Sequence, residues 1–284
     1  MSNAVILGGG GPVGIAWQAG LLTGLSAGGM HLANADAVIG TSAGAVTGAA
    51  LALGQDLHEL AVRVAEPLPL APGQQVDLAA MQAAVTEAAA GAATPAAAMA
   101  AIGRLAARSQ TAGEAEFVGR PLFAALSGRA WPASLRCTAI DIGTGELRVL
   151  DRSSEVALDA AAAASCAVPT VFPPVTLGTS RYMDGGMASP LNAHLAAGHN
   201  EVVLISCFVL TLPEGSPPAL QPAGRQQLDE LDALRQGGAA VRLIEPNAEF
   251  LELSGWGAHV MNVERTGDAY RAGLRQGGRG LAAV

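Results

Sequence analysis

The chain has 284 residues, half of them hydrophobic, and its formal net charge at pH 7 is −8. This length and apolar content are enough for a large buried core, which excludes a disordered chain. All 16 basic residues are arginine, and the acidic excess argues against a nucleic-acid partner and against a basic grip on anionic lipid. Any lipid would therefore be met through apolar side chains.

Three widely separated cysteines, Cys137, Cys166 and Cys207, lie in apolar stretches. Their odd number and spacing predict reduced core residues in a cytoplasmic protein. No spacing typical of metal ligands occurs, so we expect neither a metal nor an organic cofactor. The apolar run at residues 4–7 is too short for a signal peptide or a membrane span, and we expect neither there.

That run predicts a buried strand, which a glycine-rich loop and a helix follow. The loop has Gly9, Gly11 and Gly14 at the G-x-G-x-x-G spacing. Its N–H groups suit either the pyrophosphate of a dinucleotide or the oxyanion of an acyl-transfer intermediate. A dinucleotide site needs an acid at the end of the second strand, whereas Asp36 lies at its beginning. The oxyanion role is therefore favoured, and a nucleotide-binding protein remains an alternative.

The second strand, residues 37–39, runs into Gly40-Thr41-Ser42-Ala43-Gly44 and then into an Ala/Leu-rich helix. Strand, G-x-S-x-G and helix together are the context of a nucleophile elbow. Gly40 and Gly44 are needed because a Cβ at either would collide with the neighbouring turn, and Ser42 is held in a strained conformation at a helix N-terminus. A serine there can also be only an N-cap, but the preceding strand favours a nucleophile.

Residues 56–127 are expected to form a helical cap insertion in a single domain that spans residues 1–284. The expected helices lie near residues 57–62, in a pair within 77–109 that Gly91 and Thr94-Pro95 separate, and at 117–126. This insertion is too interrupted to span a bilayer. Whether it moves as a lid beside the active site, or only covers the core, is left open.

The rest of the chain alternates between expected strands and helices, which favours an α/β sheet. A hairpin is expected at residues 135–142 and 146–150, because Gly143-Thr144-Gly145 lies between the two strands. Further along, we expect helices near 160–165, 226–234 and 266–277, strands at 201–208 and 240–244, an extended segment at 167–174, and a surface loop at 213–222.

A second chemical cluster is Asp184-Gly185-Gly186. Asp-Gly is most often only a turn. Here a second glycine lets the backbone approach a site closely, and Asp184 is one of few acids in an apolar region. If Asp184 lies beside Ser42, it can accept the hydroxyl proton as the serine attacks.

Three segments, in this order, resemble the motifs of patatin-like phospholipases: Gly9 to Gly14, Gly40 to Gly44, and Asp184-Gly185-Gly186. A run of prolines around Phe172, and Asn192, add to the resemblance, which extends over about residues 3–198. The resemblance implies a three-layer α/β/α fold with a central mixed, mainly parallel sheet.

The same resemblance implies a Ser–Asp dyad, with Ser42 as the nucleophile and Asp184 as the base. It implies an oxyanion hole made by the amides of Gly9, Gly10 and Gly11. The other motif glycines are Gly14, Gly40, Gly44, Gly185 and Gly186.

The implied substrates are acyl esters of lipids, such as phospholipids, lysophospholipids or simpler esters, and a transient contact with a membrane surface is left open. The family usually has a basic residue just before the last glycine of the first motif. Here that residue is Val13, preceded by Pro12, which has no N–H. Because Val13 carries no charge, this departure argues against tight binding of an anionic headgroup by the glycine loop.

Two more alternatives remain at this point. A Ser-Asp-His triad of the α/β-hydrolase type would use His259, because the order Ser, Asp, His suits that fold. A protein with this fold could also bind acyl chains without turnover.

Overall fold

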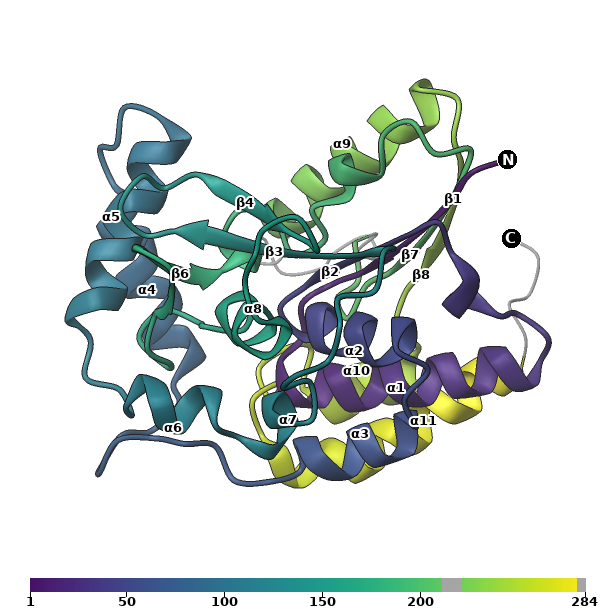
Figure 1. Cartoon of the computed structure of the whole chain (residues 1–284), viewed down its shortest axis with the longest axis horizontal. Helices are drawn as coiled ribbons and strands as arrows, with labels where there is room; N and C mark the ends of the chain where they lie inside the picture. The colour runs from purple at the N-terminus through teal and green to yellow at the C-terminus, as the bar shows by residue number, and fades with distance from the viewer. Residues whose placement is uncertain (211–220, 280–284) are drawn as a thin grey trace.

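The computed structural model describes residues 1–210 and 221–279, and they form one eight-stranded mixed sheet (Figure 1). Its order is β5-β6-β3-β2-β1-β7-β8, with β4 paired to β3. Strands β3, β2, β1, β7 and β8 pair in parallel, whereas β4 and β6 run antiparallel to β3. The strands are β1 Asn3–Leu7, β2 Ala37–Thr41, β3 Leu135–Asp141, β4 Leu147–Leu150, β5 Val175–Leu177, β6 Ser180–Asp184, β7 Glu201–Ile205 and β8 Ala240–Ile244. The predicted mainly parallel sheet is confirmed, and the β5–β6 hairpin was not predicted.

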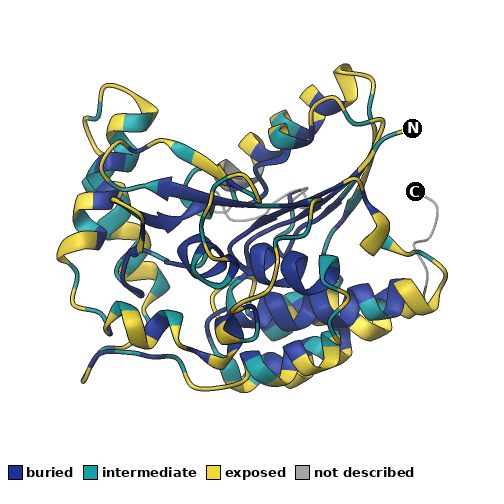
Figure 2. Cartoon of the chain, in the orientation of Figure 1, coloured by how far each residue is buried: buried dark blue, intermediate teal, exposed yellow. Residues whose placement is uncertain are grey.

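Alternate residues of the central strands face opposite layers, as the pleat requires. In β1, Val5 and Leu7 pack into one apolar cluster, while Ala4 and Ile6 pack into another on the opposite face. Both faces are covered, so most residues of the central strands are buried (Figure 2).

One face is covered by α1, α2 and α8, with α3, α10 and α11 outside them, and the other face is covered in part by α9 (Figure 1). These helices are α1 Gly11–Ala27, α2 Ala43–Ala52, α3 Leu57–Val64, α8 Leu158–Ser165, α9 Gln221–Gln236, α10 Ala248–Ser254 and α11 Thr266–Gly278. The three-layer α/β/α arrangement predicted for the chain is therefore present.

Helices α1 and α11 lie unusually close together because glycines face each other across their contact. A Cβ at Gly20 or Gly24 of α1 would overlap the backbone of α11, and a Cβ at Gly273 or Gly277 of α11 would overlap the backbone of α1. This packing ties the last described helix to the helix that begins in the glycine loop.

The insertion departs from its prediction in one place. The predicted pair forms as α4 Leu78–Ala89 and α5 Pro95–Arg108, packed near β3 and β6 around Ile102, Ile140 and Met183. The single helix expected at 117–126 is instead two short helices, α6 Glu114–Val118 and α7 Pro121–Ala124. Proline has no N–H to continue a helix and suits a first helical position, so the chain restarts at Pro121.

The prediction of an extended segment at residues 167–174 is wrong, because this segment contains a turn. Thr170, directly after Pro169, adopts a left-handed φ of 66°, and the Phe172 N–H donates to the Val168 carbonyl at 2.9 Å. The loop predicted at 213–222 lies outside the described residues up to position 220. In the part of the chain that is described, no helix combines the length and the apolar character needed to cross a membrane.

Candidate active site

The elbow predicted at Ser42 is formed at the junction of β2 and α2. Ser42 has φ 55° and ψ −118°, a backbone conformation that side-chain-bearing residues seldom adopt. A Cβ at Gly40 would overlap the backbone of the following turn, and a Cβ at Gly44 would overlap the Leu7 carbonyl. Both glycines are therefore required, and the Ser42 amide is held by the Ser165 hydroxyl at 2.9 Å.

Strand register brings Asp184 to this serine although 142 residues separate the two. Thr41 pairs with Thr138 of β3, and the next residue of β3, Ala139, pairs with Asp184 of β6. The Ser42 Oγ donates a hydrogen bond to Asp184 Oδ2 at 2.6 Å. Both side chains are buried, with 7% and 2% of their residue surfaces exposed. The contact that the sequence could not establish is present.

The Asp184 carboxylate is held by backbone on its other side, since the Gly186 N–H donates to Oδ1 at 2.7 Å. Burial raises the pKa of Asp184 to about 7, against the lowering effects of the hydrogen bonds from Ser42 and Gly186. A carboxyl group with such a pKa can accept a proton near neutral pH and return it, which is what a general base needs.

The glycine loop contributes differently at each position. The Gly9 N–H donates to the Pro190 carbonyl at 2.9 Å, so it is not free to bind an oxyanion, and the prediction that this amide belongs to the oxyanion hole is wrong. Among the described residues, the amides of Gly10 and Gly11 donate to no acceptor. Gly14 lies within α1, where a Cβ would meet Cys207 Sγ at 2.9 Å, so its role is close packing.

Asn192, whose role is not evident from the sequence, ties the ends of these segments together. Its side chain is fully buried, and Nδ2 donates to Thr41 Oγ1 at 3.0 Å and to the Gly185 carbonyl at 3.3 Å. Thr41 and Thr138 also share a hydrogen bond of 2.8 Å between their hydroxyls. Asn192 thus connects the strand before the nucleophile to the segment of the base.

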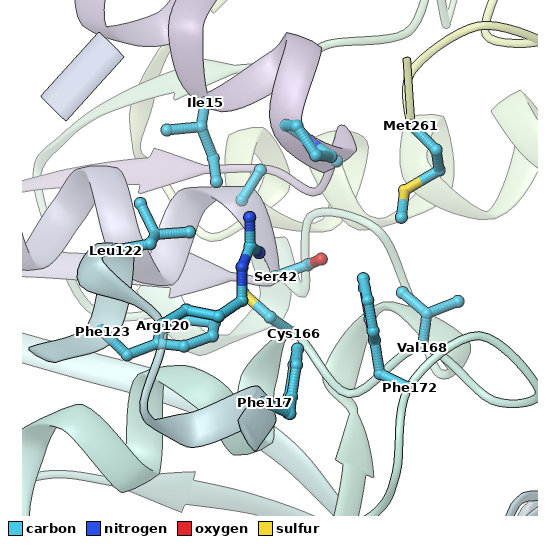
Figure 3. A pocket seen from close by; sticks show the side chains of 13 residues that line it. Ile15, Ser42, Phe117, Arg120, Leu122, Phe123, Cys166, Val168, Phe172 and Met261 are labelled. Carbon is cyan, nitrogen blue, oxygen red and sulfur yellow. The ribbon is translucent and has the colours of Figure 1, made fainter. Parts of the chain in front are cut away.

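An apolar pocket opens beside Ser42 (Figure 3). Its walls come from the start of α1, from residues 117–123, from the turn after α8, and from Met261. Phe117 stacks on Phe172 with ring centroids 4.6 Å apart, so the insertion contacts the turn directly. Only the C-terminal part of the predicted cap lines this pocket, which includes neither α4 nor α5.

Sequence reasoning missed Cys166 and Arg120 as pocket residues. Cys166 was expected in the core, as Cys137 and Cys207 are, but it is half-buried and lines the pocket. It directly follows Ser165, whose hydroxyl holds the Ser42 amide, so the end of α8 places it there. Arg120 has no signal in the sequence, because it lies in the unpredicted break between α6 and α7.

Two alternative sites lack support in this geometry. His259 is exposed, and within the described chain no histidine lines the Ser42 pocket or hydrogen-bonds to Ser42 or Asp184. Asp36 accepts a hydrogen bond from the Asn3 amide at 2.8 Å, at the amino ends of β1 and β2. The glycine loop follows the carboxyl end of β1, so Asp36 is placed wrongly for a ribose.

The fold and this site define an α/β protein with a serine on a nucleophile elbow and a buried carboxylate as its partner. The family model for patatin-like phospholipase matches residues 5–68 and 82–197, which is more than half of the chain. The chain belongs to the patatin-like phospholipase family. The matched ranges include both Ser42 and Asp184.

Among solved structures, the crystal structure of VipD from Legionella pneumophila matches with 15% sequence identity and a TM-score of 0.45. The match covers 95% of this chain and 67% of that chain. No curated protein matches the sequence significantly.

Proposed function

We propose that this protein is a serine acyl hydrolase that cleaves acyl esters of lipids through a Ser42–Asp184 dyad. Family membership supports lipid acyl hydrolase activity as the general class. The observation that carries the dyad is the 2.6 Å hydrogen bond from Ser42 Oγ to Asp184 Oδ2 at the wall of an apolar pocket.

In the first half-reaction, Ser42 Oγ attacks the ester carbonyl carbon while Asp184 takes the hydroxyl proton. The tetrahedral intermediate carries a negative charge on the former carbonyl oxygen. The unpaired amides of Gly10 and Gly11 are the proposed donors to this oxyanion. As the intermediate collapses, the alcohol leaves with the proton from Asp184, and the acyl group stays on Ser42.

In the second half-reaction, water attacks the acyl-enzyme, and Asp184 again accepts a proton. The new oxyanion uses the same two amides. Collapse returns the proton to Ser42 Oγ and releases the fatty acid. A pKa of about 7 for Asp184 suits both directions of transfer.

The pocket suits the acyl chain of such a substrate, because its walls carry Ile15, Phe117 and Leu122. The cytoplasmic location remains a prediction, and a transient contact with a membrane surface and a moving lid are left open, as they are by the sequence. Neither nucleotide binding nor acyl-chain binding without turnover is favoured by a specific observation.

Hydrolysis of p-nitrophenyl esters of increasing chain length tests the proposal. The purified protein should release nitrophenol, with kcat/KM rising as the acyl chain fills the apolar pocket. Ser42→Ala is the matched control, since it removes only the hydroxyl, and it should be inactive at an unchanged melting temperature. Equal turnover by both proteins would contradict the assignment of Ser42.

A further inference from the structure

A buried arginine lines the pocket beside the proposed nucleophile. Arg120 lies between α6 and α7, and only 7% of its surface is exposed. Its side chain lines the same pocket as Ser42 (Figure 3). The neighbouring walls are apolar, so a guanidinium there loses hydration unless a partner replaces the water.

The protein provides few hydrogen-bond partners to replace the water that Arg120 loses. Nη2 donates to the Glu66 carbonyl at 3.3 Å, and within the described residues this is its one hydrogen bond and there is no salt bridge. Nε and Nη1 have no partner in that part of the chain and are not sealed from solvent, and Arg120 lines the pocket. Burial lowers the pKa of Arg120, while Cys166 and Glu66 oppose this effect.

The first motif leaves the site without another positive charge. Val13 stands where the resemblance places a basic residue, and its side chain is fully buried in the core. Among the described pocket residues, Arg120 is the only basic one. A cation with free donors, in an apolar pocket beside a nucleophile, is suited to an anionic group on the substrate.

We propose that Arg120 binds an anionic group, a phosphate or a carboxylate, that the acyl ester carries within reach of the pocket. This inference rests on the proposed esterase function and narrows its substrate class to negatively charged acyl esters. The N–H groups of Nε and Nη1 can each donate a charge-assisted hydrogen bond to either anion. In this proposal the positive charge of the site comes from Arg120 in the insertion, and not from the glycine loop.

Three water-soluble esters of equal acyl length separate the sources of the anion. Monohexanoylglycerol is neutral, its glycerol phosphate counterpart carries a phosphate on the alcohol side, and the glycerol monoester of adipic acid carries a carboxylate at the acyl end. The measured quantity is the ratio of kcat/KM for each anionic ester to that of the neutral one. Because one enzyme preparation gives both values, partial unfolding cancels from the ratio.

The wild-type protein should prefer one anionic ester at least tenfold, and the preferred ester identifies the source of the anion. Arg120→Met should reduce that ratio at least tenfold, mainly through KM, and Arg120→Lys should restore part of it because the charge returns. Arg129→Met is the matched control, since Arg129 is exposed and outside the pocket, and it should keep the wild-type ratio.

A wild-type ratio of one or less for both anionic esters would overturn the proposal. So would an unchanged ratio in Arg120→Met, or a ratio that Arg129→Met reduces equally. If the wild-type protein hydrolyses the neutral ester without preference, only this inference fails. If it hydrolyses none of the three esters, the proposed function fails as well.

Discussion

The two sides of the pocket are built in different ways. On one side, Ser42, Asp184 and the glycine loop lie at the ends of strands of one sheet, and backbone hydrogen bonds hold them. The other side is a wall made by residues 117–123, the turn after α8, and Met261, whose side chains come from short helices and loops. In the proposed mechanism the strand ends provide the groups for chemistry, whereas the wall determines what fits beside them. Changes at the strand ends should therefore affect kcat, and changes in the wall should affect selectivity.

The largest effect is expected at the base. Asp184→Asn cannot accept a proton, so kcat should fall at least about a hundredfold, the lower end of general-base effects. In the wild type, activity should rise with pH through a midpoint near 7, where the carboxyl group ionises. A pH profile of kcat for both proteins measures the two effects. If Asp184→Asn keeps the wild-type kcat, the strand ends do not control the chemical step as proposed.

Asp184→Asn should also change how the stability of the protein depends on pH. The pKa of Asp184 is raised from 3.8 to about 7, so between these values the native state keeps a proton that the unfolded state has lost. Wild-type stability from this group therefore falls as pH rises through that window. Asp184→Asn lacks this titration, and its melting temperature relative to wild type should rise between about pH 4 and about pH 7.

The next effect is expected in the glycine loop. A Cβ at Gly10 would lie 2.5 Å from Cys207 Sγ, so Gly10→Ala must displace the loop. We expect kcat to fall about ten- to a thousandfold with a smaller change in KM, the scale of losing one oxyanion donor. Gly14→Ala is the matched control, because its Cβ would also meet Cys207 Sγ, at 2.9 Å, while the Gly14 amide is already bonded to the Gly10 carbonyl. A loss of kcat in Gly14→Ala as large as in Gly10→Ala would argue against the assigned donors.

A smaller effect concerns backbone strain at the nucleophile. Ser42 has a φ of 55°, which glycine adopts without cost. Ser42→Gly should therefore be more stable to urea than Ser42→Ala by about 1 kcal/mol, the lower end of the cost of such a conformation. Equal stabilities would mean that the elbow stores no strain.

The smallest effect is expected at His259, which is exposed in the segment before Met261. His259→Ala should keep kcat within about fivefold of wild type, far from the hundredfold loss expected for a base. A hundredfold loss at an unchanged melting temperature would favour a Ser-Asp-His triad.

The strand-end side of the pocket could be predicted from the sequence better than the wall, because its parts are local sequence patterns. The elbow and the strands are local patterns, so Gly40, Ser42 and Gly44 carry their own signal. The contact with Asp184 depends on register through β3, which no local pattern reveals. The wall depends on packing between distant segments, such as Phe117 on Phe172, and Arg120 was missed because Pro121 divides a helix that was predicted to be continuous.

The central claim is that Asp184 activates Ser42, and labelling with a fluorophosphonate tests it most directly. Mass spectrometry of the wild-type protein should place the label on Ser42, at a rate that rises with pH through about 7, where the pKa of Asp184 lies. Asp184→Asn should label at least about a hundredfold more slowly while it remains folded, as a cooperative melting transition shows. Labelling of Ser42 at the wild-type rate in Asp184→Asn, or no label on Ser42 in the wild type, would contradict the account.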